Sequence, residues 1–156
     1  MKSCEICGAG PLRKIRVSNY LYKTSLGDIR IEGDQSLSKC VACKEVFVPG
    51  KLISKWNQNI LRYLIEKKGP LSAQELKFAF AVLPYSQSEI AYATSKQRST
   101  LSKYKTGVNP VDPLFDHTLR EIIKDHLKGR RQTLGLLKAR KDSSVKEPPL
   151  TKIKIA

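Results

Sequence analysis

The N-terminal third of the chain alternates apolar and polar positions in the manner of β-strands. The alternation is interrupted at Ser18-Asn19 and again around Gly27, and Gly33-Asp34 is a further turn signal. This pattern predicts a small, twisted antiparallel sheet. The apolar positions that carry it are Leu12, Ile15, Val17, Tyr20, Tyr22, Leu26, Ile29 and Ile31.

From Ser54 the period changes to that of amphipathic helices. A first helix is expected to end at Gly69-Pro70, since proline cannot continue it. Ser72 followed by Glu75 has the spacing of a capping box and predicts the start of a second helix. The apolar positions are Trp56, Ile60, Leu61, Tyr63, Leu64 and Ile65 in the first helix, and Leu76, Ala79, Phe80 and Leu83 in the second.

Residues 85–107 predict two short helices joined by a tight turn. Ser86 and Glu89 form a second capping-box pair, the turn falls near Ser95, and the second short helix spans residues 97–104. A closing amphipathic helix should follow. Its apolar positions are Leu114, Leu119, Ile122, Ile123 and Leu127.

Four cysteines form two matched pairs, Cys4 with Cys7 and Cys40 with Cys43, each with two residues between. Two such pairs can place four thiolates around one ion, and Zn²⁺ favours a closed set of four cysteines. A site of this kind is structural, because it leaves no position for a reactive water. A redox pair or four unrelated thiols are the alternatives.

These patterns predict an α+β protein, in which a small zinc-bound antiparallel β domain precedes an all-α domain. The expected divisions are a zinc-binding β domain over 1–53, a linker helix over 54–70, a helix-turn-helix domain over 71–128 and a basic tail over 129–156. A sheet of about 50 residues has too small a core to be stable alone, so metal binding should supply much of its folding energy.

The formal net charge is +15, from 29 Lys and Arg against 14 Asp and Glu. Such an excess attracts polyanions, with nucleic acid the first partner class and an anionic membrane surface the second. The tail over 129–156 carries +6 of this charge and few large apolar residues, so it is expected to be mostly disordered. Its Leu134, Leu136 and Leu137 could instead extend a helix or dock a partner.

Several classes of protein are disfavoured. No apolar run reaches the 18 or so residues of a membrane span, and the first ten residues lack the apolar core of a signal peptide, so a cytoplasmic protein is expected. No phosphate loop, nucleophile elbow or paired-carboxylate motif appears, which argues against an enzyme. Trp56, Tyr20 and Tyr22 are interpreted as core or interface residues, and His117 and His126 as surface residues.

The second short helix of the 85–107 segment offers a polar and basic face that suits base edges and phosphates in a DNA major groove. Phosphate contacts are expected from the start of the preceding helix and from the basic tail. The predicted DNA-binding residues are Ser86, Gln87, Lys96, Gln97, Arg98, Ser99, Ser102 and Lys103.

Residues 87–107 resemble the helix-turn-helix of Xre/Cro-type repressors, whose pattern is Q-x-E-[LI]-A-x(8)-S-T-[IVL]-S-[RK]-[WY]-x-x-G. The match has no gap. The matching residues are Gln87, Glu89, Ile90, Ala91, Ser99, Thr100, Leu101, Ser102, Lys103, Tyr104 and Gly107.

Over residues 1–127 the whole plan is similar to the MqsA-type antitoxins with a YgiT-type zinc finger. The resemblance implies a structural zinc domain that binds a toxin, and a C-terminal domain that dimerises, binds its own promoter and represses the operon. By position, Ser99 and Lys103 fall where that family's recognition helix contacts bases. The chain departs from the pattern at Ser95, where glycine is usual, and at Lys96 and Lys105, which add positive charge.

The sequence therefore predicts a dimeric transcriptional regulator that binds specific sequences in double-stranded DNA and also neutralises a toxin. Two alternatives stay open: a mobile-element or phage regulator without a toxin partner, and a zinc-ribbon protein that binds RNA. A helix-turn-helix used only for packing is the simplest competing interpretation of residues 87–107.

Overall fold

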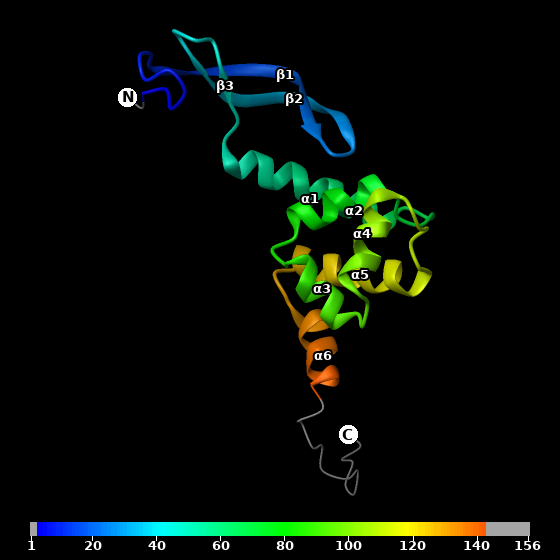
Figure 1. Ribbon diagram of the computed structural model, residues 1–156. Coiled ribbons are helices and arrows are strands. Elements are labelled where there is room, and N and C mark those ends of the chain that lie inside the picture. Colours follow the sequence, from blue (N-terminus) through cyan, green and yellow to red (C-terminus); the bar gives the residue numbers. More distant parts are fainter. Residues whose placement is uncertain (1–2, 143–156) are drawn as a thin grey trace, which may run out of the picture.

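A computed structural model describes residues 3–142. A three-stranded antiparallel sheet at one end of the molecule is followed by a six-helix domain (Figure 1). The predicted α+β class is confirmed. The strands are β1 (Leu12–Thr24), β2 (Gly27–Cys40) and β3 (Val46–Phe47), and the helices are α1 (Gly50–Glu66), α2 (Ala73–Val82), α3 (Gln87–Ala93), α4 (Arg98–Thr106), α5 (Pro113–Leu127) and α6 (Gln132–Lys141).

Strands β1 and β2 form one long hairpin with an irregularity in the middle. Ser18 pairs with Asp34 and the next pair is Tyr20 with Ile31, so that Asn19 on one strand is skipped together with two residues on the other. The prediction of a turn at Gly33-Asp34 is wrong, because β2 runs through it. The residues interrupting the alternation form a β-bulge, and the bulge returns the apolar side chains of both halves to one face.

Helix α1 is longer at its start than predicted and is more than a linker. It begins at Gly50, after Pro49 at the N-cap, rather than at Ser54. Leu61 and Leu64 are completely buried in the core of the helical domain. Because α1 also carries the sheet, it belongs to both parts of the molecule (Figure 1).

The predicted helix starts at Ser72 and Ser86 are confirmed. In each case the serine side chain accepts a hydrogen bond from the backbone N–H three residues later. The glutamate at that position, Glu75 or Glu89, accepts one from the serine N–H, which completes the capping box. Local sequence thus fixes where α2 and α3 begin.

The buried face of α5 begins one residue later than predicted. Leu114 is 72% exposed, and Phe115 is buried in its place, against Tyr104 of α4. Asp112 caps this helix, and Pro113 stands at its first position. Of the two histidines, His117 is exposed as expected, whereas His126 is half-buried edge-on to Tyr85, so its assignment to the surface is wrong.

Helix α6 contradicts the expectation of disorder for residues 132–141. Leu134 is buried in the helical core, and Leu137 packs against it. Asp125 of α5 accepts hydrogen bonds from both the backbone N–H and the hydroxyl of Thr133, which fixes the first turn of α6. The same expectation for 143–156 lies outside the described residues.

Trp56 joins the sheet to the helices. Its side chain is 4% exposed, and its ring lies 5.5 Å from the ring of Tyr20 and 5.2 Å from that of Tyr22. The Tyr22 hydroxyl also donates to Asn57 Oδ1 at 2.9 Å. The prediction that these aromatic residues serve the core or an interface is confirmed.

Arg120 of α5 closes the end of α1. Its guanidinium donates to Asp116 Oδ2 at 2.8 Å and to the backbone carbonyls of Ile65, Lys67 and Gly69, at 3.3, 2.8 and 2.6 Å. The Arg120 side chain is 12% exposed. One side chain thus satisfies three carbonyls, at the end of α1 and in the loop that follows it.

Replacing Arg120 should therefore destabilise the helical domain. We expect Arg120→Ala to lower the free energy of unfolding by about 3 kcal/mol, because Asp116 and the carbonyls lose their common partner and both side chains of the ion pair are largely buried. Arg120→Lys should lose about half as much, since an ammonium group cannot span three carbonyls. Urea unfolding monitored by helical circular dichroism measures both, and an unchanged midpoint for Arg120→Ala would contradict the assignment.

Candidate metal centre and nucleic-acid interface

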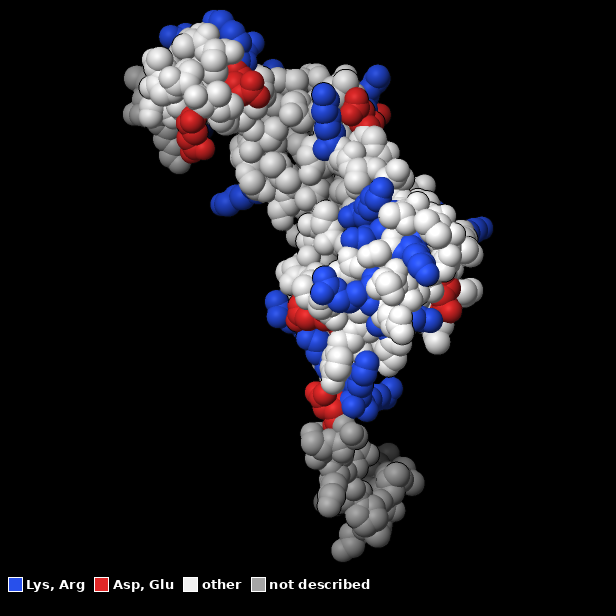
Figure 2. All heavy atoms as spheres, viewed as in Figure 1, with Lys and Arg blue, Asp and Glu red and all other residues white. Residues whose placement is uncertain are grey.

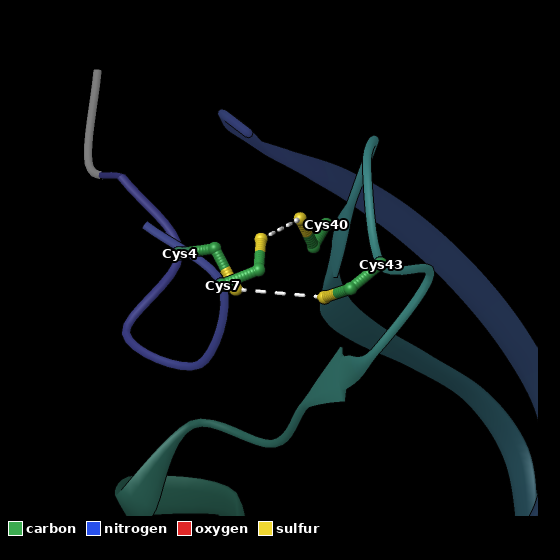
Figure 3. A group of neighbouring side chains, drawn as sticks. All are labelled: Cys4, Cys7, Cys40 and Cys43. Carbon is green, nitrogen blue, oxygen red and sulfur yellow. Dashed lines mark hydrogen bonds between the residues drawn. The ribbon is translucent and has the colours of Figure 1, made fainter. Parts of the chain in front are cut away.

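The four cysteine sulfurs meet at the outer end of the hairpin, and their side chains point toward one another (Figure 3). Cys4 and Cys7 come from the loop before β1, and Cys40 and Cys43 from the end of β2 and the loop after it. All four Sγ atoms lie within 4.8 Å of one another. Cys4 and Cys40 are buried, whereas Cys7 and Cys43 are exposed.

The spacing of the sulfurs fits a tetrahedral zinc ion. Zn–S bonds of about 2.3 Å in a tetrahedron place neighbouring sulfurs about 3.8 Å apart. The distances from Cys4 to Cys43 and from Cys7 to Cys40 are both 3.7 Å. This is far longer than the roughly 2.05 Å of a disulfide bond. The cluster can therefore hold a metal ion, and its four thiol donors suit Zn²⁺.

Both cysteine loops have the same backbone design. The N–H of Ala9 is directed at the Cys7 sulfur, and that of Glu45 at the Cys43 sulfur, two residues after each cysteine. The intervening residue, Gly8 or Lys44, has φ of 65° or 64°. The sequence predicted this turn at Gly8. It gave no such signal at Lys44, where a lysine adopts the same left-handed conformation.

These amide groups favour the thiolate, which is the form that binds metal. The N–H of Ala9 lowers the pKa of the Cys7 thiol to about 6. Burial opposes ionisation of Cys40, but the N–H groups of Cys43 and Ala42 outweigh it and lower the pKa of that thiol as well. At Cys43 the N–H of Glu45 acts in the same direction, but burial and the neighbouring cysteine sulfurs outweigh it and raise the pKa of that thiol to about 12. Backbone geometry thus favours the thiolate at Cys7 and Cys40.

Gly10 is a part of the site that sequence reasoning missed. A Cβ atom at this position would lie 2.8 Å from Ala42 Cβ and 2.9 Å from the Cys40 sulfur. The two cysteine loops can approach each other only because Gly10 has no side chain. A glycine three residues after Cys7, where the first loop returns to β1, is the signal that could have found it.

The predicted DNA-binding residues lie together on the α3–α4 unit. Ser86 and Gln87 stand at the start of α3, Lys96 lies in the turn, and Gln97 is the N-cap of α4. Helix α4 spans Arg98–Thr106, one residue later at its start and two later at its end than predicted. The exposed members are Ser86, Gln97, Arg98, Ser99, Ser102 and Lys103.

Gln87 and Lys96, two of the predicted DNA-binding residues, connect this unit to neighbouring elements of the protein. The Gln87 side-chain amide donates to the Arg98 carbonyl at 3.1 Å and to the Ser102 hydroxyl at 3.2 Å, so it ties α3 to α4. Lys96 is half-buried and its ammonium lies 3.4 Å from Asp112 at the start of α5. Gln87 therefore holds α3 against α4, and Lys96 holds the turn between them against the start of α5.

Ser95 lies in the turn between α3 and α4 with φ of 54°. The sequence had identified this position as one where related turns use glycine. The left-handed conformation explains that preference, since a side chain with a Cβ is less comfortable there. On α4 itself, Leu101 and Tyr104 are buried, which fixes the orientation of the helix.

Positive charge accompanies this unit. Figure 2 shows Lys and Arg side chains spread over the visible face of the helical domain, from the level of α3 and α4 down to α6. The Lys138 ammonium of α6 lies 2.9 Å from the Glu89 carboxylate of α3. Its hydrogen bond, followed by the one from the Ser86 N–H, lowers the pKa of Glu89 to about 2. The negative charge of Glu89 is thus compensated by Lys138 and leaves the positive charge of the α3–α4 unit unopposed there.

Comparison of the chain with protein-family models, with curated proteins and with solved structures finds no match. Within residues 3–142, no helix combines the length and the apolar character needed to cross a bilayer. The molecule thus combines a four-cysteine cluster on a β-hairpin with a small helical domain that follows it.

Removal of the metal should undo the sheet and spare the helices. We expect the apoprotein to lose strand signal and the emission of Trp56, the one tryptophan, to shift to longer wavelength as the hairpin leaves it. Helical circular dichroism should persist, because the core of the helical domain contains no cysteine. Chelation at constant pH followed by both spectra tests this, and an unchanged Trp56 spectrum would refute it.

Gly10→Ala should weaken metal binding without touching a ligand. The added methyl group collides with the Cys40 sulfur and with Ala42, at a cost of about 1–3 kcal/mol, and part of this cost should appear as lower zinc affinity. Competition with a chromogenic chelator measures the affinity. Gly50→Ala is the matched control, because a Cβ at Gly50 meets nothing within 4 Å. Equal affinities for both variants would contradict the role given to Gly10.

Proposed function

We propose that this protein is a sequence-specific DNA-binding transcriptional regulator with a structural zinc site, acting as a homodimer in the cytoplasm. The observation that carries the proposal is the α3–α4 unit. Two short helices meet through a tight turn, a glutamine of the first is hydrogen-bonded to the second, and the second exposes a polar, basic face.

In this proposal α4 enters the major groove of the DNA. Gln97 at its N-cap and Arg98, Ser99 and Lys103 on the helix are exposed and can reach base edges or phosphates. Leu101 and Tyr104 are buried on the other side of the helix. Gln87 holds the first turn of α4 in place and stands beside Ser86 at the edge of this surface. The net charge of +15 supports phosphate contacts but carries no sequence information.

The finer proposal is that the chain is an antitoxin of the MqsA type, which neutralises a toxin and represses its own operon. Its support is the order of the parts, with a four-cysteine hairpin first, a helix shared by both parts next and then a helical domain that contains the α3–α4 unit. Growth rescue on co-expression with the product of the adjacent reading frame tests it. Absence of any toxic neighbour would favour a mobile-element or phage regulator.

A zinc-ribbon protein that binds RNA is the remaining alternative. A helix such as α4 fits the wide major groove of B-form DNA and not the narrow one of A-form RNA. Preference for structured RNA over duplex DNA of equal length and charge would therefore replace the regulator proposal. No function as an enzyme is proposed.

Lys103→Ala should weaken binding to the specific DNA site by roughly 1–3 kcal/mol if this side chain contacts a base. Binding of the zinc-loaded protein to its own upstream DNA, titrated with salt and compared with a shuffled fragment, measures the effect. Lys55→Ala is the charge-matched control, since Lys55 is exposed on α1 outside the α3–α4 unit.

Two outcomes would count against the proposal. An equal loss on specific and shuffled DNA would show that Lys103 contacts only phosphates. Equal and steeply salt-sensitive binding of the unmodified protein to both fragments would mean that net charge accounts for all of the recognition.

A further inference from the structure

A groove of about 560 Å³ lies between the hairpin and α1. One side of the groove is lined by residues of α1, among them Trp56, Ile60 and the exposed Tyr63. The other side is lined by four consecutive residues of β2, from Ile29 to Glu32. Because neighbouring side chains of a strand point to opposite faces, four in a row can line a groove only along the edge of the strand.

That edge of β2 has no partner strand among the described residues. The sheet order is β1-β2-β3, but β3 pairs only with Ser38 and Lys39. The inner half of β2, over residues 28–35, is therefore bonded to β1 on one side and open on the other. An open edge beside an apolar groove is the geometry that receives an added strand.

The charges along this edge specify the kind of strand. Asp28, Glu32 and Asp34 are exposed along β2 and outnumber its one exposed arginine there, Arg30, which also lines the groove. Neither Asp28 nor Glu32 forms an ion pair with another described residue. An added strand should therefore carry lysine or arginine at alternate positions and apolar side chains between them, directed into the groove.

The chain itself ends with such a segment. After Thr151 it continues Lys152, Ile153, Lys154 and Ile155, which is strict alternation of basic and β-branched residues. This segment lies beyond the described residues, which end at position 142. Figure 1 shows α6 at the end of the helical domain remote from the sheet, so that the chain leaves it far from its own groove.

We propose that residues 152–155 of a second copy of this chain add as a strand to the open edge of β2, with Ile153 and Ile155 in the groove over Trp56 and Tyr63. Lys152 and Lys154 then lie on the face of β2 that carries Asp28, Glu32 and Asp34. Exchange of tails between two copies is symmetric, so one dimer contains two such contacts. This inference is independent of DNA binding by α4.

Sedimentation velocity of the full-length, zinc-loaded chain tests the exchange. We expect a concentration-dependent dimer whose dissociation constant rises at least tenfold in the Ile153→Asp/Ile155→Asp double variant, because two charged side chains cannot enter an apolar groove. Both substitutions lie outside residues 3–142, which build the fold described above.

A synthetic peptide of residues 146–156, added to the double variant, tests the groove. Saturable binding should change the emission of Trp56, which lines the groove, and a scrambled peptide of the same composition should have no effect. Glu32→Lys should weaken peptide binding about fivefold, and a peptide with Lys152→Glu and Lys154→Glu should restore it. Leu21→Asp, on the opposite face of the hairpin, is the control and should bind normally.

Three results would overturn the proposal. Equal binding of the scrambled peptide, or none of either peptide, would assign the groove to another partner. An unchanged dimer in the double variant would remove the tail from the dimer interface. A monomer at all concentrations, whose Trp56 emission still depends on Ile153 and Ile155, would show that each chain binds its own tail.

Discussion

The convergence of four cysteine sulfurs, which can hold a metal ion, is the constraint on which the N-terminal sheet depends. Over residues 3–49 the buried hydrophobic side chains are only Cys4, Leu37 and Cys40, and two of these three are members of the cysteine cluster. A hairpin of this length cannot offset its conformational entropy with one buried leucine. The four sulfurs close the hairpin at its outer end, and the amide groups around Cys7 and Cys40 favour the thiolates that a metal requires.

At the end of the sheet away from the cysteines, packing against α1 compensates for the small hydrophobic core of the hairpin. Trp56 on α1 receives the rings of Tyr20 and Tyr22, and Leu61 and Leu64, further along α1, lie in the core of the helical domain. Because α1 packs against both the sheet and the helical core, it fixes where the sheet lies relative to the other helices. This coupling explains why a stretch that looks like a linker in sequence contributes buried residues to both parts of the fold.

What sequence predicts well here is what depends on a few adjacent residues. The capping boxes at Ser72 and Ser86 need four residues each, and each cysteine pair needs only its own loop. What it predicts poorly depends on distant partners. The bulge at Gly33 looks like a turn because only β1 shows that the strand continues, and α6 looks disordered because the pocket for Leu134 is supplied by other helices.

The bulge also makes the hairpin sensitive to the number of its residues. The skipped residues, Asn19 on β1 and two on β2, keep Tyr20, Tyr22 and Ile31 on the face that meets Trp56. Losing one residue on either side would turn the tip of the hairpin over and present its charged side chains to Trp56. A length change there would be more damaging than most substitutions, although no apolar residue, ligand or cap would have been removed.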